Sequence, residues 1–260
     1  MPWTLRCRLS GIHESNSTLD RTTKITRTNE SLDWHTTRGL DLLEEAKETT
    51  SKAAKPTGFF GRVLARGWAW GHKGLYKNTA RILDLQPDDT YLEIGFSSGL
   101  FIKQYASHVA RIAGLDHSDD MVKLASSINS DLIRSGKAEF KQGTVSTLPW
   151  NDNEFSVVVG IETFFFWSEP ETSLKEIFRV LTPGGRLVLE MAYNQDDRRD
   201  HSKQIDKYDL KLYSGEEMKA LLKESGFSDI SLDYYKSLWI PFKGYIVPKG
   251  MIVKAIKKNN

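Results

Sequence analysis

A short glycine-containing stretch, LEIGFSSG at residues 92–99, has the features of a ligand-binding turn. An acid, Glu93, comes two residues before Gly95, and Gly99 stands where a helix is expected to begin. Glycine permits a sharp turn from strand to helix and a close approach of the backbone to a ligand, and the free N–H groups of the first helical turn face that ligand. The stretch therefore predicts a loop that binds a small molecule.

The ligand expected at this loop is a nucleoside. Asp116 follows Gly95 by 116 − 95 = 21 residues, the distance at which an acid at the end of a second strand reaches the two hydroxyls of a ribose. The dinucleotide pattern G-x-G-x-x-G is not met, because Ser97 and Leu100 occupy two of its glycine positions. Glu93 disfavours a polyanion and suits a ligand that carries positive charge.

The surrounding chain alternates short β-rich runs with helical patterns, which indicates parallel strands joined by helical crossovers. We expect five such strands and a final antiparallel pair, at residues 90–95, 111–116, 138–143, 155–162, 186–192, 228–235 and 250–258. We expect helices at 58–83, after Ser118 as far as Leu132, from Pro170 and after Ser214. Ligands of such sheets bind beyond the carboxyl ends of the strands, where the glycine loop and Asp116 both fall.

Composition excludes several classes of site and partner. The 36 basic and 34 acidic residues give a net charge of +2, so no nucleic-acid partner is expected. One cysteine and six scattered histidines predict neither a disulfide framework nor a metal site, and they suit a cytoplasmic location. No apolar run approaches the roughly 20 residues that a membrane span needs.

Two regions are expected from the balance of polar and apolar residues. Residues 1–56 are rich in Ser, Thr and charged side chains, which predicts a disordered tail. A transit peptide is the alternative, but the acids Glu14, Asp20 and Glu30 do not fit its pattern. Residues 57–260 are expected to form the folded domain.

Four stretches, in order and spacing, resemble the class I S-adenosylmethionine-dependent methyltransferases. They are LEIGFSSG, GLDHSDDMVKLA, GTVSTLPWNDNEFSVVV and EIFRVLTPGGRLVL, within residues 75–257. The resemblance implies an α/β fold: a doubly wound, mostly parallel, seven-stranded Rossmann-like sheet with a reversed last strand. It also implies that S-adenosylmethionine lies across the carboxyl ends of its first, second and fourth strands.

The same resemblance implies a role for each residue that matches a family motif. The methionine end of the cofactor would be held by the loop and the acid before it, the ribose by the acid of the second motif, and the adenine by side chains on either side of it. In that order the residues are Glu93, Gly95, Phe96, Ser97 and Gly99; Asp116; and His117, Met121, Thr144 and Val145.

Three positions depart from the family pattern. Ser97 replaces the middle glycine, which the loop tolerates if the φ angle of Ser97 is ordinary. Thr144 and Ser156 stand where the family often has aspartates. The departures bear more on cofactor affinity than on the fold.

The stretch ETFFFWSEP at 162–170 follows the fourth strand, where substrate and methyl group meet in the family. Its aromatic run predicts either core packing or a pocket for an apolar or aromatic acceptor. Glu162 is the candidate general base, with turn capping or a contact to the sulfonium as alternatives. His72 and Tyr76 are candidates to cover the methionine end, and His72 is also a candidate catalytic residue. The charged stretch 194–209 is interpreted as a solvated loop, with a lid as the alternative.

These observations predict an S-adenosylmethionine-dependent methyltransferase that acts on a small molecule by in-line displacement. The main alternative is a non-catalytic module that binds S-adenosylmethionine or S-adenosylhomocysteine. A nicotinamide-dependent oxidoreductase and a methyltransferase with a macromolecular substrate are weaker alternatives, since the dinucleotide pattern and a basic face are both missing.

Overall fold

The computed structural model describes residues 73–236 and 249–259. The predicted tail, the boundary at residue 56/57 and the first part of the expected helix at 58–83 lie outside the described residues. The rest of that helix is α3, Lys73–Leu83.

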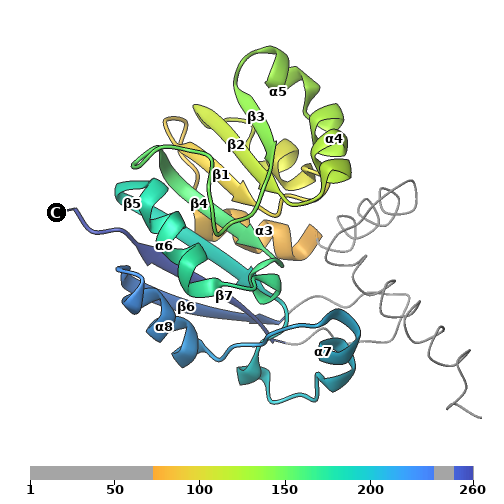
Figure 1. Ribbon diagram of the computed structural model, residues 1–260, viewed down its shortest axis with the longest axis vertical. Coiled ribbons are helices and arrows are strands. Elements are labelled where there is room, and N and C mark those ends of the chain that lie inside the picture. Colours follow the sequence, from red (N-terminus) through yellow and green to blue (C-terminus); the bar gives the residue numbers. More distant parts are fainter. Residues whose placement is uncertain (1–72, 237–248, 260) are drawn as a thin grey trace, which may run out of the picture. The chain divides into compact units, whose positions relative to one another are not determined.

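Seven strands form one sheet in the order β3-β2-β1-β4-β5-β7-β6 (Figure 1). β7 pairs antiparallel with both β5 and β6, and all the other pairs are parallel. The predicted doubly wound, mostly parallel sheet with a reversed last strand is therefore confirmed. The strands are β1 (Thr90–Ile94), β2 (Arg111–Asp116), β3 (Ala138–Gln142), β4 (Phe155–Ile161), β5 (Leu181–Met191), β6 (Ser228–Lys236) and β7 (Lys249–Ile256).

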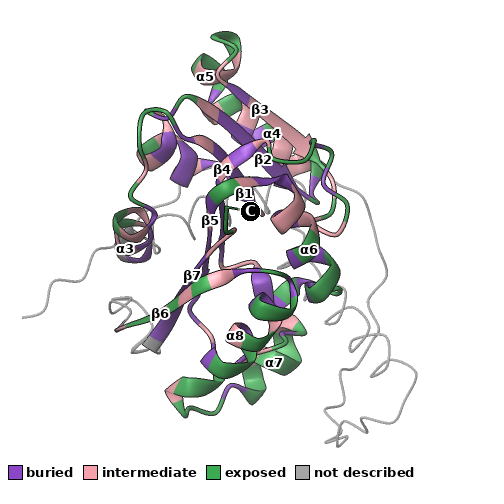
Figure 2. Cartoon of the chain, turned by 90° about the vertical axis from the view of Figure 1, so that its left-hand side faces the viewer, coloured by how far each residue is buried: buried purple, intermediate pink, exposed green. Residues whose placement is uncertain are grey.

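Helices cover both faces of this sheet. Figure 2 shows the largely buried strands between α3 on one side and α6 and α8 on the other. After α3 come η1 (a π-helix, Ile102–Ala106), α4 (Asp119–Ile128), α5 (Ser130–Arg134), η2 (Phe164–Phe166), α6 (Pro170–Val180), η3 (Gln195–Asp197), α7 (Ser202–Tyr208) and α8 (Gly215–Glu224).

The core consists of one apolar layer on each face of the sheet, because successive side chains of a strand point to opposite faces. Leu92 and Ile94 of β1 pack with the buried side chains of α6 and α8. Tyr91 of the same strand packs on the other face with Leu75 and Leu83 of α3. Glu93 lies on this second face, so the alternation of β1 places an acid under α3.

The helix expected to run from Ser118 to Leu132 is instead two helices, α4 and α5, separated at Asn129. Asn129 leaves the helical conformation, with φ −108° and ψ 27°. Its fully buried side-chain amide donates to the carbonyls of Gly99 and Ala125, at 3.1 and 3.0 Å. The apolar spacing continues through the break, which is why the sequence pattern does not show it.

The amino ends of β1, β4 and β5 are joined by a polar network. The Ser156 hydroxyl donates to Asp89 at 2.7 Å, and Asp89 forms an ion pair of 2.6 Å with Arg186. Arg186 also donates to the carbonyls of Leu83 and Asp84 at the end of α3. Ser156, at a position where the family often has an aspartate, thus has a structural role at the opposite end of the sheet from the glycine loop.

Candidate functional site

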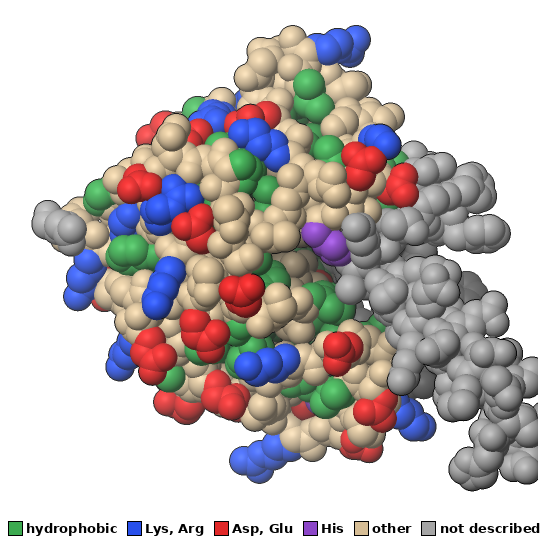
Figure 3. All heavy atoms as spheres, viewed as in Figure 1, with side chains coloured by type: hydrophobic (Ala, Val, Ile, Leu, Met, Phe, Trp, Pro, Cys, Tyr) green, Lys and Arg blue, Asp and Glu red, His purple; other side chains and the backbone are tan. Residues whose placement is uncertain are grey.

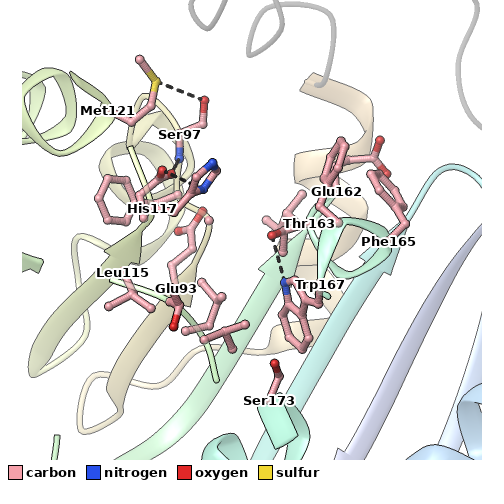
Figure 4. A pocket seen from close by; sticks show the side chains of 18 of the residues that line it. Glu93, Ser97, Leu115, His117, Met121, Glu162, Thr163, Phe165, Trp167 and Ser173 are labelled. Atoms are coloured by element: carbon pink, nitrogen blue, oxygen red, sulfur yellow. Dashed lines mark hydrogen bonds and ion pairs between the residues drawn. The ribbon is translucent and has the colours of Figure 1, made fainter. Parts of the chain in front are cut away.

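A cavity of about 490 Å³ lies beyond the carboxyl ends of β1, β2 and β4. Figure 4 shows its two sides: Ser97, Leu115, His117 and Met121 on one, and Glu162, Thr163, Phe165 and Trp167 on the other. The first side carries the residues expected to hold a nucleoside. The second carries the aromatic stretch that follows β4.

The glycine loop needs glycine at residue 95 for two reasons. Gly95 has φ +71°, a backbone conformation that residues with a side chain rarely adopt. A Cβ atom there would also lie 2.6 Å from the Thr163 hydroxyl oxygen. Thr163 in turn accepts a hydrogen bond of 3.2 Å from the Trp167 indole N–H. The loop is therefore closely packed against the turn after β4.

The condition set for Ser97, an ordinary φ angle, is not met, because its φ is +51°. The residue adopts the left-handed conformation of the glycine that it replaces. In this conformation its N–H donates to the Asp116 carboxylate at 2.9 Å. The contact to Asp116 is thus made at the expense of local strain.

We predict that Ser97→Gly stabilises the protein by about 0.5–1 kcal/mol. The left-handed conformation costs a side-chain-bearing residue roughly 1–2 kcal/mol, and the added chain entropy of glycine offsets part of that gain. Urea unfolding measures the change. Ser107, with φ −65°, is the matched control, since Ser107→Gly should lose stability; a loss in both variants would contradict strain at Ser97.

Asp116 lies at the end of β2 with its carboxylate buried beside the loop. Its two oxygens accept hydrogen bonds of 2.9 Å from the N–H groups of Ser97 and Ser118. Burial raises the pKa of Asp116, and these two hydrogen bonds oppose the rise. A carboxylate has about four acceptor positions, so two remain for the hydroxyls of a ribose. His117 follows, 45% exposed, with its Nδ1 atom 3.7 Å from Asp116.

The other cofactor candidates fall into two groups. Phe96, Met121, Thr144 and Val145 line the cavity together with the residues already described. Gly99 does not line it: a Cβ atom there would lie 2.8 Å from Ala125 and from Asn129. The glycine at 99 therefore allows the loop to pack on α4, a role in packing that the loop pattern alone does not reveal.

Glu93 is buried on the floor of the cavity and accepts a hydrogen bond of 2.7 Å from the Tyr91 hydroxyl. Burial raises the pKa of Glu93 to about 8, and the charge of Asp116 adds to the rise, whereas the Tyr91 hydrogen bond opposes it. A carboxyl in this state favours a positively charged ligand, because such a ligand stabilises its ionised form.

Glu162 lies directly after β4, half-buried on the wall of the cavity, with φ +55°. The backbone N–H of Ala192 donates to its carboxylate. Burial raises the pKa of Glu162 to about 7, although the hydrogen bonds from Ala192 and Glu190 act in the opposite direction. A residue with a strained backbone, whose carboxyl lines a cavity and has a pKa near 7, is typical of functional sites.

Of the two covering candidates, only Tyr76 can be placed. It extends from α3 and lines the cavity, while His72 lies outside the described residues. Burial raises the pKa of Tyr76 well above its ordinary value, and the nearby charges of Glu93, Glu190 and Glu162 add to the rise. Tyr76 is therefore close to all three acids.

The stretch 194–209, interpreted as a solvated loop, instead contains η3 and α7. Tyr208 at the end of α7, with Leu210 just after it, lines the cavity. His201 is 7% exposed, and both oxygens of Asp197 lie 2.9 Å from its ring. The charge pattern did not reveal these contacts, because it does not show that one of the charged side chains, Asp197, is buried against His201.

The aromatic side of the cavity combines the predicted stretch after β4 with a residue that sequence reasoning had not joined to it. Phe165, Phe166 and Trp167 line the cavity with Tyr193 from the end of β5. Glu190, one acid in the apolar run LVLEM, was also missed. A single acid within a buried strand was the available signal for it.

The helices in the described ranges, 73–236 and 249–259, include none with the length and apolar character required to cross a membrane.

Comparisons with known proteins agree with this geometry. Residues 92–189 match a family model described as a methyltransferase domain. An uncharacterized methyltransferase of Bacillus subtilis, YdaC, is 27% identical over 158 residues, which span 60% of this chain and 81% of YdaC. An O-methyltransferase of Pyrenophora dematioidea is 26% identical over 172 residues, 64% of each chain.

Solved structures show the same fold. A Haloferax volcanii methyltransferase, determined in complex with the Trm112 activator, superposes with a TM-score of 0.68 at 20% identity, covering 76% of this chain and 95% of the other. A Haemonchus contortus phosphoethanolamine N-methyltransferase bound to S-adenosylhomocysteine superposes with a TM-score of 0.63 at 13% identity, covering 76% and 58%.

The sheet order, the cavity at its carboxyl edge and the matched domain model together define the class of the protein. The chain contains a class I S-adenosylmethionine-dependent methyltransferase domain and is an enzyme of that class.

Proposed function

We propose that the protein transfers the methyl group of S-adenosylmethionine to a small molecule with an apolar or aromatic body. The observation that carries the proposal is the two-sided cavity, in which nucleoside-binding residues face an aromatic wall. The domain responsible would comprise residues 57–260, in a reducing compartment such as the cytoplasm.

The residues present fit the cofactor. Gly95 forms the tight turn that lines the cavity, Asp116 accepts only two of about four possible hydrogen bonds from the described residues, which leaves acceptor positions for the ribose, and Glu93 suits the positive charge of the methionine end. His117, Met121, Thr144 and Val145 would contact the adenine. When bound, the cofactor supplies a sulfonium methyl that is already a good electrophile. The protein contributes alignment of the acceptor, which can lower the barrier by about 7–11 kcal/mol.

The aromatic wall supports an apolar or aromatic acceptor. Phe165, Trp167 and Tyr193 offer ring surface, and the described residues that line the cavity include no lysine or arginine that could pair with an anionic acceptor. Matched relatives include fungal O-methyltransferases and a demethylmenaquinone methyltransferase of Oceanobacillus iheyensis, 28% identical over 123 residues and half its length. On the face shown in Figure 3, acidic and basic side chains are interspersed, which also favours a small acceptor over a polyanion.

We further propose that Glu162 is the general base. It is the cavity acid nearest in sequence to the aromatic wall, and a base whose pKa is near 7 is efficient at neutral pH. Glu162→Gln should lower kcat by roughly 10²–10⁴-fold and leave S-adenosylhomocysteine affinity within about threefold.

A methyl-transfer assay tests both proposals. Formation of S-adenosylhomocysteine is followed with a panel of phenols, hydroquinones, aliphatic alcohols and amines. Glu171→Gln, an exposed acid of α6, is the matched control and should keep wild-type turnover. Full turnover by Glu162→Gln would remove the base assignment, and binding of the cofactor without turnover on any acceptor would count against the proposed transfer.

Cofactor affinity is predicted to rise with pH between about 6.5 and 9. The raised pKa of Glu93, about 8, means that the free protein holds a proton there at neutral pH. A cationic ligand stabilises the carboxylate, so binding releases that proton and becomes tighter as pH rises through 8. Calorimetry of S-adenosylmethionine binding in buffers of different ionisation enthalpy measures the release. Glu93→Gln should bind more weakly and lose the pH dependence; an unchanged slope in this variant would assign the proton elsewhere.

A further inference from the structure

Behind the cavity wall lies a second buried acid, Glu190 of β5. Its side chain is fully buried and does not line the cavity. The backbone N–H of Glu162 donates to the Glu190 carbonyl at 2.9 Å, which brings the two residues side by side at the ends of β4 and β5. The two carboxyl groups are close enough for each to shift the pKa of the other.

Two carboxylates in contact cannot both be ionised without strong repulsion, and neither could donate a hydrogen bond. The Tyr235 hydroxyl donates to Oε1 of Glu190. Oε2 of Glu190 is buried and has no hydrogen-bond partner among the described residues. A proton on Oε2 would make this atom a hydrogen-bond donor, and Glu162 is the neighbouring carboxylate that could accept from it.

The surroundings of the pair decide which carboxyl keeps the proton. Burial and the charge of Glu162 raise the pKa of Glu190 well above its ordinary value. The neighbouring Glu190 acts in the opposite direction on Glu162, whose pKa burial raises only to about 7, so the pair favours the proton on Glu190 and the charge on Glu162. The other titratable groups that face the pair are Tyr76 from α3, Tyr235 from β6 and Tyr193 after β5, with Glu93 on β1 near Tyr76.

We propose, on the basis of the proposed function, that Glu190 is a positioning residue for methyl transfer: its protonated carboxyl donates to Glu162 and keeps the Glu162 carboxylate charged and aimed into the cavity. The acceptor is then a molecule whose nucleophilic atom carries a proton, such as a hydroxyl. The acceptor oxygen bonds to the methyl carbon as the carbon–sulfur bond breaks with its electron pair to sulfur. The hydroxyl proton passes to Glu162, which later returns it to solvent.

Two substitutions of Glu190 separate positioning from simple packing. Glu190→Gln retains an N–H donor toward Glu162, so kcat/KM should stay within about threefold of the wild type. In the profile of kcat/KM against pH, the midpoint of the acidic limb should lie at or below that of the wild type. Glu190→Leu removes the donor, so the acidic limb should move up by about one pH unit or more, with about a tenfold loss at pH 7 that is largely recovered at pH 9. Equal losses in both variants at every pH, or an unchanged limb in both, would overturn the proposal.

A second measurement does not depend on turnover. In protein labelled with ¹³C at the glutamate carboxyls, and with Glu162→Gln used for assignment, the Glu162 resonance should titrate near pH 7 in the wild type and in Glu190→Gln, and higher in Glu190→Leu. Titration of Glu162 near pH 4.5 in the wild type would refute the proposed interaction of Glu162 with a protonated Glu190, even if the enzyme is active. Conversely, titration near pH 7 without methyl transfer to any acceptor supports the pair and leaves only the proposed transfer in error.

Discussion

Replacing Asp116 with alanine is expected to weaken S-adenosylhomocysteine binding by about 10²–10⁴-fold. A carboxylate that accepts two ribose hydroxyls contributes roughly 1.5–3 kcal/mol for each hydrogen bond, and both are lost in the variant. The carboxylate also orders the loop, because it accepts from the N–H groups of Ser97 and Ser118. Part of the loss should therefore come from a loop that is no longer held in its binding conformation.

Asp116→Asn and Asp119→Asn complete the experiment. Asp116→Asn keeps the shape of the side chain but has one acceptor oxygen in place of two. Its affinity for S-adenosylhomocysteine should therefore lie between those of the wild type and Asp116→Ala. Asp119 begins α4, is 56% exposed and pairs with Lys123, and its replacement should leave binding unchanged. Circular dichroism verifies folding, and calorimetry measures the dissociation constants. If folded Asp116→Ala binds within threefold of the wild type, Asp116 does not hold the ribose.

Replacing Arg186 with methionine is expected to lower the free energy of unfolding by about 3–5 kcal/mol. Arg186 and Asp89 form a nearly buried ion pair, with exposed fractions of 17% and 7%. Removing one partner of such a pair leaves the other charge uncompensated. The same guanidinium donates to the Leu83 and Asp84 carbonyls, so the variant also loses the attachment of α3 to β5.

The pH dependence of stability gives an independent measure of this ion pair. Although burial pushes the pKa of Asp89 upward, the hydrogen bonds from Arg186 and from the Gln86 backbone bring it below its ordinary value. A lowered folded-state pKa stabilises the protein above the unfolded value, near 4, and the contribution disappears as pH falls below it. Arg186→Met should therefore lose less stability than the wild type between pH 5 and pH 3, as followed by urea unfolding.

An exposed ion pair provides the matched control for Arg186. Lys103 and Asp131 lie 2.7 Å apart with exposed fractions of 39% and 56%. Such a pair contributes about 0–1 kcal/mol because water screens it, so Lys103→Met should change stability little. Comparable losses in the two variants would mean that burial does not explain the importance of Arg186.

Local sequence determined the strands of the sheet and the position of the glycine loop. Each strand from β1 to β4 was predicted to within about one residue, because short runs of β-branched and apolar residues, bounded by turn residues, need no knowledge of distant contacts. Gly95 and Asp116 were linked by their spacing, because the ends of neighbouring parallel strands meet at one edge. The predicted cofactor and class of enzyme followed from the same motifs, and the comparisons confirmed both.

Only the tertiary structure decided how residues from different elements combine. The apolar spacing of 118–132 could not show that Asn129 would leave the helix to bond with the Gly99 carbonyl, 30 residues earlier in the chain. The charges of 194–209 hid Tyr208, which lines the cavity from the end of α7. Glu162 was visible as an acid at a strand end, but its contact with Glu190 depends on the pairing of β4 with β5. Local propensity predicts the backbone of one segment, whereas a pair of neighbouring acids or a cavity wall requires side chains that only the folded chain brings close together.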